Sequence, residues 1–168
     1  GQADIVEKLV YSRNSRDLET FFRTQVLFWM LAATDGHAKN FSIRLLPGSA
    51  YEMTPMYDVL SVWPVTGQGA NLLNYKELKL AMALRGTNAH YLLEEVQARH
   101  FVRLAERCRI PRDPAIRLVE ELIAKTPSVV EKAGASLPDG YPLDVFEAIA
   151  KGLQWSADRL GNSLGLGI

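Results

Sequence analysis

The chain has 168 residues, 48% of them hydrophobic, and its 19 Lys and Arg side chains balance its 19 Asp and Glu side chains. This size and composition fit one domain, or one lobe of a larger protein, with a substantial core. Zero net charge argues against a strongly basic nucleic-acid-binding protein but leaves room for a local basic patch. The apolar runs are too short to cross a membrane, and the single cysteine, Cys108, fits a reducing, cytoplasmic compartment.

The N-terminal part of the sequence predicts two helices. Residues 3–12 carry apolar side chains on one side, which is typical of a short amphipathic helix. A second helix is expected over 15–33, with Ser15 as its N-cap and acidic side chains in its first turn. Its second half is apolar on nearly every face, so we expect it to be central and buried. Four aromatic side chains are assigned to the core rather than to a base-stacking surface: Phe21, Phe22, Phe28 and Trp29.

The remainder of the chain predicts one β-hairpin and three further helices. Apolar and polar residues alternate on both sides of a Pro-Gly-Ser turn, which predicts a hairpin over 40–55. Helical periodicity is expected over 89–109, over 114–133, and from Pro142 to about residue 161. The expected fold is therefore mainly α, with one small hairpin.

A polar cluster interrupts the hydrophobic pattern directly after the second helix. Asp35 and Asn40 are five residues apart there, and Asp58 follows the predicted hairpin. Because a hairpin returns the chain close to where it left, we expect Asn40 and Asp58 to face each other. An amide oxygen and a carboxylate are hard ligands that suit Mg²⁺, and Asp35 would be placed to accept a proton from an attacking hydroxyl. Protein kinases use the same spacing of a catalytic Asp, a metal-binding Asn and a second metal-binding Asp for phosphoryl transfer.

Ordinary structural explanations exist for each of these features. Asp and Gly are common in tight turns, so "DGH" after a helix could be a simple connection, and Asn40 and Asp58 could cap adjacent segments. His90 and His100 are expected to pack on helices or cap them, because their spacing offers no metal site. Three arginines four residues apart form either a solvated helix face or a surface for DNA phosphates or an acidic partner: Arg99, Arg103 and Arg107.

Three separated motifs resemble the C-terminal part of HipA-type serine/threonine kinases, the toxins of bacterial toxin–antitoxin pairs. They are "ATDGHAKNFSI", "YEMTPMYDVLS" and "ELKLAMAL". The resemblance runs through most of the chain and is most specific over residues 31–84. It implies that residues 1–168 form one unit, the α-helical C-lobe of a protein-kinase-like fold with a hairpin beside the catalytic loop.

The resemblance also assigns roles to five residues. Asp35 matches the catalytic Asp and would be the general base, while Asn40 and Asp58 match the residues that hold the metal. His37, two residues after the base, or Lys39 would steady the transferring phosphate. The implied reaction moves the γ-phosphate of ATP, bound with Mg²⁺, to Ser or Thr of a protein.

The same resemblance implies partners. These are a HipB-like helix-turn-helix antitoxin, an aminoacyl-tRNA synthetase as the substrate, and operator DNA contacted through the antitoxin complex. Kinases of this family also need an N-terminal lobe that covers ATP, and no Gly-rich loop or strand-borne lysine precedes Leu31. Lys8 lies in a predicted helix, and "GQGA" at 67–70 follows the catalytic loop instead of preceding it. We therefore expect a lobe of a longer or truncated kinase that binds ATP weakly by itself.

Two hypotheses from other functional classes stay open at the level of sequence. One is a non-catalytic module that keeps an antitoxin-binding or DNA-binding surface. The other is a metal-dependent phosphoesterase that uses Asp35, His37 and Asp58. The second would require a denser cluster of Asp and His ligands than three histidines supply.

Overall fold

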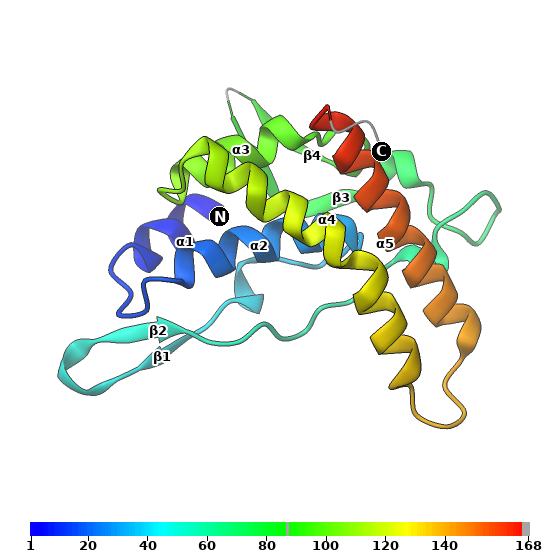
Figure 1. The fold of residues 1–168 in the computed structure, drawn as a ribbon, viewed down its shortest axis with the longest axis horizontal. Helices are drawn as coiled ribbons and strands as arrows, with labels where there is room; N and C mark the ends of the chain where they lie inside the picture. Colours follow the sequence, from blue (N-terminus) through cyan, green and yellow to red (C-terminus); the bar gives the residue numbers. More distant parts are fainter. Residues whose placement is uncertain (87, 166–168) are drawn as a thin grey trace.

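The structure, a computed structural model, describes residues 1–86 and 88–165 and is mainly α-helical (Figure 1). Its α-helices are α1 (Gln2–Leu9), α2 (Asp17–Met30), α3 (Ala98–Arg107), α4 (Arg112–Ala135) and α5 (Leu143–Ser163). Two antiparallel hairpins lie between α2 and α3 in the chain: β1 (Ile43–Leu45) with β2 (Tyr51–Met53), and β3 (Lys79–Arg85) with β4 (Ala89–Leu92). Within the described residues, no helix is both long and apolar enough to cross a bilayer.

Helix α2 forms the centre of the core, with α1, α3, α4 and α5 packed around it and the β1–β2 hairpin below it in the view of Figure 1. The four aromatic side chains predicted to be core are all at most 2% exposed: Phe21, Phe22, Phe28 and Trp29. Trp29 meets Phe101 of α3 edge-on, with ring centroids 6.0 Å apart. Truncating a buried aromatic side chain of this kind typically costs about 3–5 kcal/mol, so α2 carries much of the stability of the domain.

The start of α2 differs from the prediction. The helix begins at Asp17 and Ser15 is not its N-cap. The Asp17 side chain is instead buried, and its Oδ2 accepts hydrogen bonds from Ser12 Oγ at 2.5 Å and from the backbone N–H of Met53 at 2.6 Å. Asp17 therefore joins the beginning of α2 to strand β2. Capping rules consider only neighbouring residues, so they could not predict this long-range contact.

The helix predicted over 89–109 is wrong in its first part. Strand β4 pairs with β3 in the register Lys79↔Leu92 and Arg85↔Ala89, and α3 begins only at Ala98. Most of the interior of β3 is buried, as expected for a strand with one face on the core: Leu80, Met82, Ala83 and Leu84. Ala83 breaks the strict alternation where the pairing register shifts. Because β4 is stabilised by pairing with a separate segment, periodicity within 89–109 could not reveal it. The described residues form two hairpins where one was predicted.

The C-terminal helices agree with the prediction. Helices α4 and α5 lie within two residues of the expected ranges and pack against each other (Figure 1). The apolar side chains that α5 contributes to the core recur at a helical spacing: Leu153, Ala157 and Leu160. The opening of α5 after Pro142 follows the general preference for proline at helix starts.

His100 at the start of α3 caps the helix, as expected. Its Nδ1 accepts a hydrogen bond from the backbone N–H of Gln97 at 3.1 Å, and its ring stacks on His90 with centroids 4.0 Å apart. Burial, together with the nearby charges of His90, Arg99 and Arg103, lowers the pKa of His100 to about 4. The folded chain therefore favours a neutral imidazole at this position.

We expect the domain to lose stability as pH falls below about 6.5, where an unfolded histidine takes up a proton, until about pH 4, where folded His100 does so. The contribution of this one group should be about 1–2 kcal/mol between pH 7 and pH 5. Urea unfolding of the parent chain and of His100→Asn at both pH values measures it. The variant should lose less stability on acidification. An equal loss in both proteins would contradict the attribution of this pH dependence to His100.

Replacing Asp17 by Ala should lower the free energy of unfolding by about 2–3 kcal/mol, because the Met53 N–H loses its acceptor and the partly buried Ser12 hydroxyl keeps only its longer bond to the carbonyl of Tyr51. Asp113 provides a matched control, since it is also an aspartate in the first turn of a helix but is exposed. Asp113→Ala should cost less than about 1 kcal/mol, the range of a helix-dipole contact. Equal costs in urea unfolding would show that Asp17 acts only through the helix dipole.

Candidate functional site

The polar loop that follows α2 is pressed onto the end of that helix. The chain leaves the helix through a left-handed residue, Ala32 (φ 48°), and the N–H of Ala33 donates to the carbonyl of Phe28 at 2.7 Å. Gly36 lies against the Phe28 ring so closely that a Cβ there would lie 2.3 Å from it. At the far end of the loop, Phe41 packs edge-on against Phe21, with centroids 5.1 Å apart. The loop is thus anchored to the core at both ends.

Asn40 and Asp58 are in direct contact. Asn40 is 3% exposed, and its Oδ1 accepts a hydrogen bond from the backbone N–H of His37 at 3.1 Å. Its Nδ2 donates to Asp58 Oδ2 at 2.9 Å and to the backbone carbonyl of Asp58 at 3.3 Å. The proximity predicted from the hairpin is therefore confirmed, while the role of the two residues as metal ligands stays a prediction.

The other predicted site residues lie on the same loop with more solvent around them. The Asp35 side chain is 67% exposed, and its Oδ1 is 3.5 Å from His37 Nε2. The second ring nitrogen of His37, Nδ1, is buried and has no hydrogen-bond partner within the described part of the chain. Lys39 is exposed, and its carbonyl accepts a hydrogen bond from the Tyr57 hydroxyl at 2.8 Å. Tyr57 therefore adds a second link between the loop and the segment that carries Asp58.

The segment after Asp58 is attached to the end of α2, a feature that sequence reasoning missed. Ser61 Oγ donates to the carbonyl of Leu31 at 2.6 Å, and Trp63 Nε1 donates to the carbonyl of Met30 at 3.0 Å. The sequence signal for this attachment was the presence of a serine and a tryptophan within the apolar run "VLSVWPV". A partly buried hydroxyl or indole N–H requires a hydrogen-bond acceptor elsewhere in the fold. The polar loop and the segment that follows Asp58 are therefore both attached to the C-terminal end of α2.

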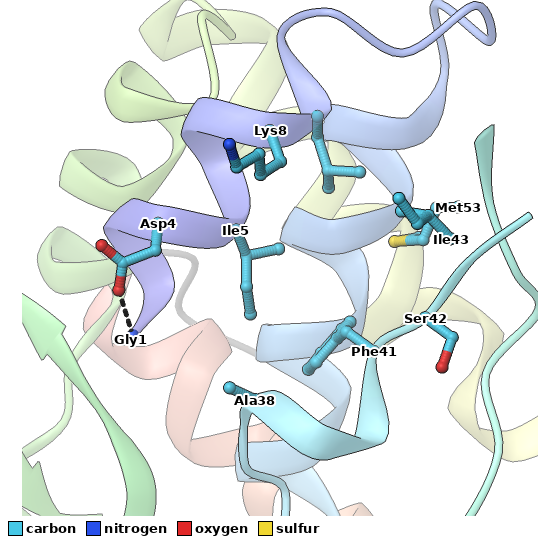
Figure 2. A pocket seen from close by; sticks show the side chains of 10 residues that line it. Gly1, Asp4, Ile5, Lys8, Ala38, Phe41, Ser42, Ile43 and Met53 are labelled. Carbon is cyan, nitrogen blue, oxygen red and sulfur yellow. Dashed lines mark hydrogen bonds and ion pairs between the residues drawn. The ribbon is translucent and has the colours of Figure 1, made fainter. Parts of the chain in front are cut away.

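A groove of about 390 Å³ lies between α1 and the segment that continues from the loop into β1. Figure 2 shows the side chains of Ile5 and Phe41 facing it, with Ile43 and Met53 near the hairpin and Asp4 and Lys8 on α1. Its lining is mostly apolar, and Asp35, Asn40 and Asp58 are not among the residues that form it. The groove is therefore a neighbour of the polar site and not part of it.

The chemistry of the Asn40–Asp58 pair fits a hard divalent cation. The exposed carboxylate of Asp58 is a hard oxygen ligand, while Asn40 turns its Nδ2 toward that carboxylate and its Oδ1 toward the N–H of His37. Asn40 would therefore ligate a cation through Oδ1 only if its amide turned. No group of three or more His, Cys, Asp or Glu side chains that could hold a metal exists among residues 1–86 and 88–165. A cation at this pair would therefore take most of its ligands from water or from substrate phosphates, as Mg²⁺ commonly does. This donor set does not support the phosphoesterase hypothesis, which requires more protein ligands.

A model of one protein family, described as the HipA-like C-terminal domain, matches residues 2–130. The chain belongs to the HipA-like C-terminal domain family. The matched range contains the polar loop and Asp58, and it ends within α4. The resemblance inferred from three short motifs is thereby confirmed at the level of the family.

The fold of this HipA-like domain also matches a solved structure. A chain of the Shewanella oneidensis MR-1 toxin–antitoxin complex of HipA, HipB and operator DNA superposes with a TM-score of 0.79 at 18% sequence identity. The alignment covers 98% of the present chain and 37% of that chain. At this identity the likeness shows a shared fold, and the present chain spans little more than a third of the length of its structural relative.

Replacing Asn40 by Asp should destabilise the HipA-like domain at pH 7 by about 1–3 kcal/mol, because it sets a second carboxylate beside Asp58 and removes the amide donor. The deficit relative to the parent should shrink near pH 4, where one of the two carboxylates becomes protonated. Urea unfolding at both pH values measures it. Asn71→Asp, in an exposed loop, is the matched control, and a deficit at Asn40 no larger than at Asn71 would contradict the observed contact.

Proposed function

We propose that this chain is the catalytic C-lobe of a HipA-type serine/threonine kinase with a protein-kinase-like fold. The observation that carries the proposal is the 2.9 Å contact between Asn40 and Asp58, made beside a loop that also presents an exposed carboxylate at Asp35. A catalytic Asp, an Asn five residues later and a second Asp after a hairpin are the elements that kinases use in phosphoryl transfer. Membership of the HipA-like C-terminal domain family supports the same conclusion.

In the proposed reaction, Asp35 is the general base. Its carboxylate accepts the proton of a Ser or Thr hydroxyl while that oxygen attacks the γ-phosphorus of ATP. The bond from the γ-phosphorus to the bridging oxygen breaks, and ADP leaves with the electron pair. The exposure of Asp35 leaves room for a hydroxyl on another protein, and His37, 3.5 Å away, can orient the carboxylate. Either His37 or Lys39 steadies the transferring phosphate.

Asn40 and Asp58 would hold Mg²⁺, which when bound neutralises charge on the phosphates of ATP. The contribution of the chain itself is to keep the carboxylate of Asp58 in position. The buried amide of Asn40, fixed by the N–H of His37, donates to that carboxylate from one side. Asp58 thus has a defined orientation before any substrate binds, which is the preorganisation that electrostatic catalysis requires.

The remaining parts of the proposal concern partners. An N-terminal kinase lobe would cover ATP, as the resemblance to HipA-type kinases implies. The substrate would be an aminoacyl-tRNA synthetase in the cytoplasm, and the regulator a HipB-like antitoxin bound to operator DNA. The structural relative is a chain of a complex of HipA, HipB and operator DNA, which supports the proposed antitoxin and DNA partners.

The kinase proposal predicts transfer of labelled phosphate from Mg²⁺-ATP to a synthetase when the chain is mixed with a separately expressed N-terminal lobe of a HipA-type kinase. Asp35→Gln should lower the rate at least about 100-fold without changing the urea midpoint, since general-base catalysis typically contributes this much. Asp139→Asn, at an exposed aspartate in the turn before α5, is the matched control and should keep the parental rate.

A non-catalytic module is the alternative candidate, because exposed arginines follow one face of α3: Arg99, Arg103 and Arg107. It predicts that the chain retains a HipB-like antitoxin in a pull-down but shows no transfer with any added lobe. Transfer that survives Asp35→Gln would contradict the assigned base. Transfer that requires both the lobe and Asp35 would exclude the module as the complete function.

A further inference from the structure

Asp58 lies in a part of the chain that cannot fix its own conformation. Residues 54–62, all of them described, form neither helix nor strand. Asp58 itself has a φ of 55°, in the left-handed region that residues other than glycine adopt infrequently. The Tyr57 hydroxyl links the residues before Asp58 to the carbonyl of Lys39, and the residues after Asp58 are held by a separate set of contacts at the end of α2.

We infer that Trp63 is a positioning residue that holds Asp58 against Asn40, and that it can do so only because residue 152 on α5 is glycine. This inference depends on the proposed function in one respect: it treats Asn40 and Asp58 as a cation site. The contact between Asn40 and Asp58 is measurable whether or not a cation binds.

One side of Trp63 is attached to the end of α2. Its Nε1–H donates to the carbonyl of Met30, and two neighbouring bonds continue the attachment, from Ser61 Oγ to Leu31 and from the N–H of Val62 to Ala32 at 3.3 Å. The three acceptors are consecutive carbonyls that lead directly into the loop of Asp35 and Asn40. The segment that carries Asp58 and the loop that carries Asn40 are therefore positioned by the same three residues.

The other side of Trp63 is held by an aromatic cluster next to α5. The indole stacks on Tyr75, with centroids 5.6 Å apart and planes 7° apart, and meets Trp155 edge-on at 5.7 Å. Arg159 donates to the Tyr75 hydroxyl at 2.7 Å and lies over the Trp155 ring at 5.4 Å. Burial raises the pKa of Tyr75 to about 12, so its hydroxyl stays neutral. The ring of Trp63 thus has little freedom to turn.

Gly152 allows this arrangement. A Cβ at position 152 would lie 2.3 Å from the Trp63 ring, a separation that no side chain tolerates, so the indole rests directly on the backbone of α5. Glycine inside a helix is unfavourable unless a close approach requires it. Any larger residue at 152 must displace the indole, and with it the N–H that reaches Met30.

The test follows the side-chain amide protons of Asn40 by NMR in the ¹⁵N-labelled, metal-free chain. In Gly152→Ala and in Trp63→Phe, which keeps a ring but lacks the indole N–H, exchange of these protons should accelerate about tenfold as Asp58 moves away. Gly134→Ala is the matched control: it adds a methyl group to a glycine in the last turn of α4, beside another ring, Phe146 at 3.0 Å. The control should leave the Asn40 signals unchanged.

Unchanged Asn40 signals in Trp63→Phe, or in a folded Gly152→Ala whose indole N–H signal has moved, would overturn the inference. If Gly152→Ala does not fold, Trp63→Phe decides the question alone. A Mg²⁺ titration of the same samples tests the proposed function separately. Loss of the Asn40 contact in both variants, with no response of the parent to Mg²⁺, would support the positioning role and contradict the cation site.

Discussion

The C-terminal end of α2 is the constraint on which the site depends. A helix ends in carbonyls that have no partner within the helix, and here that end lies inside the molecule, where water cannot serve all of them. Trp63 and Ser61 supply donors to the carbonyls of Met30 and Leu31. Satisfying the helix end therefore brings the returning segment to the start of the polar loop. The meeting of two chain segments at the site follows from a requirement of the core.

The core and the site also share side chains. Phe28 of α2 is buried and at the same time sets the closest approach of Gly36 in the loop. Phe41, at the end of the loop, packs on both Phe21 and Phe28. Because interiors are packed at nearly crystalline density, a change in these rings is transmitted to the loop backbone instead of being absorbed by empty space. The geometry of the loop is thus as well defined as that of the helices, although the loop itself is irregular.

Local patterns in the sequence predicted the helices and, through the return of a hairpin, the meeting of Asn40 and Asp58. They failed where the decisive partner is distant in the chain. Ser15 is a reasonable N-cap by local rules, but the carboxylate of Asp17 bonds to strand β2 and the helix starts there instead. Strand β4 exists because β3 pairs with it. The acceptor for Trp63 lies 33 residues upstream, and no local pattern indicates it.

The distribution of charge around the pair bears on the kind of substrate it can accept. Asn40 is neutral and buried, so the pair carries a single negative charge, that of Asp58. If position 40 also carried a carboxylate, the two like charges would repel each other and the site would repel the phosphates of ATP. With an amide there, Asp58 is held without a cation, and under the proposed function a Mg²⁺ ion arriving with a nucleotide would keep most of its positive charge for the phosphates. Under the proposed kinase function, an amide–carboxylate pair is therefore better suited than two carboxylates to a site that must bind an anionic substrate and its cation together.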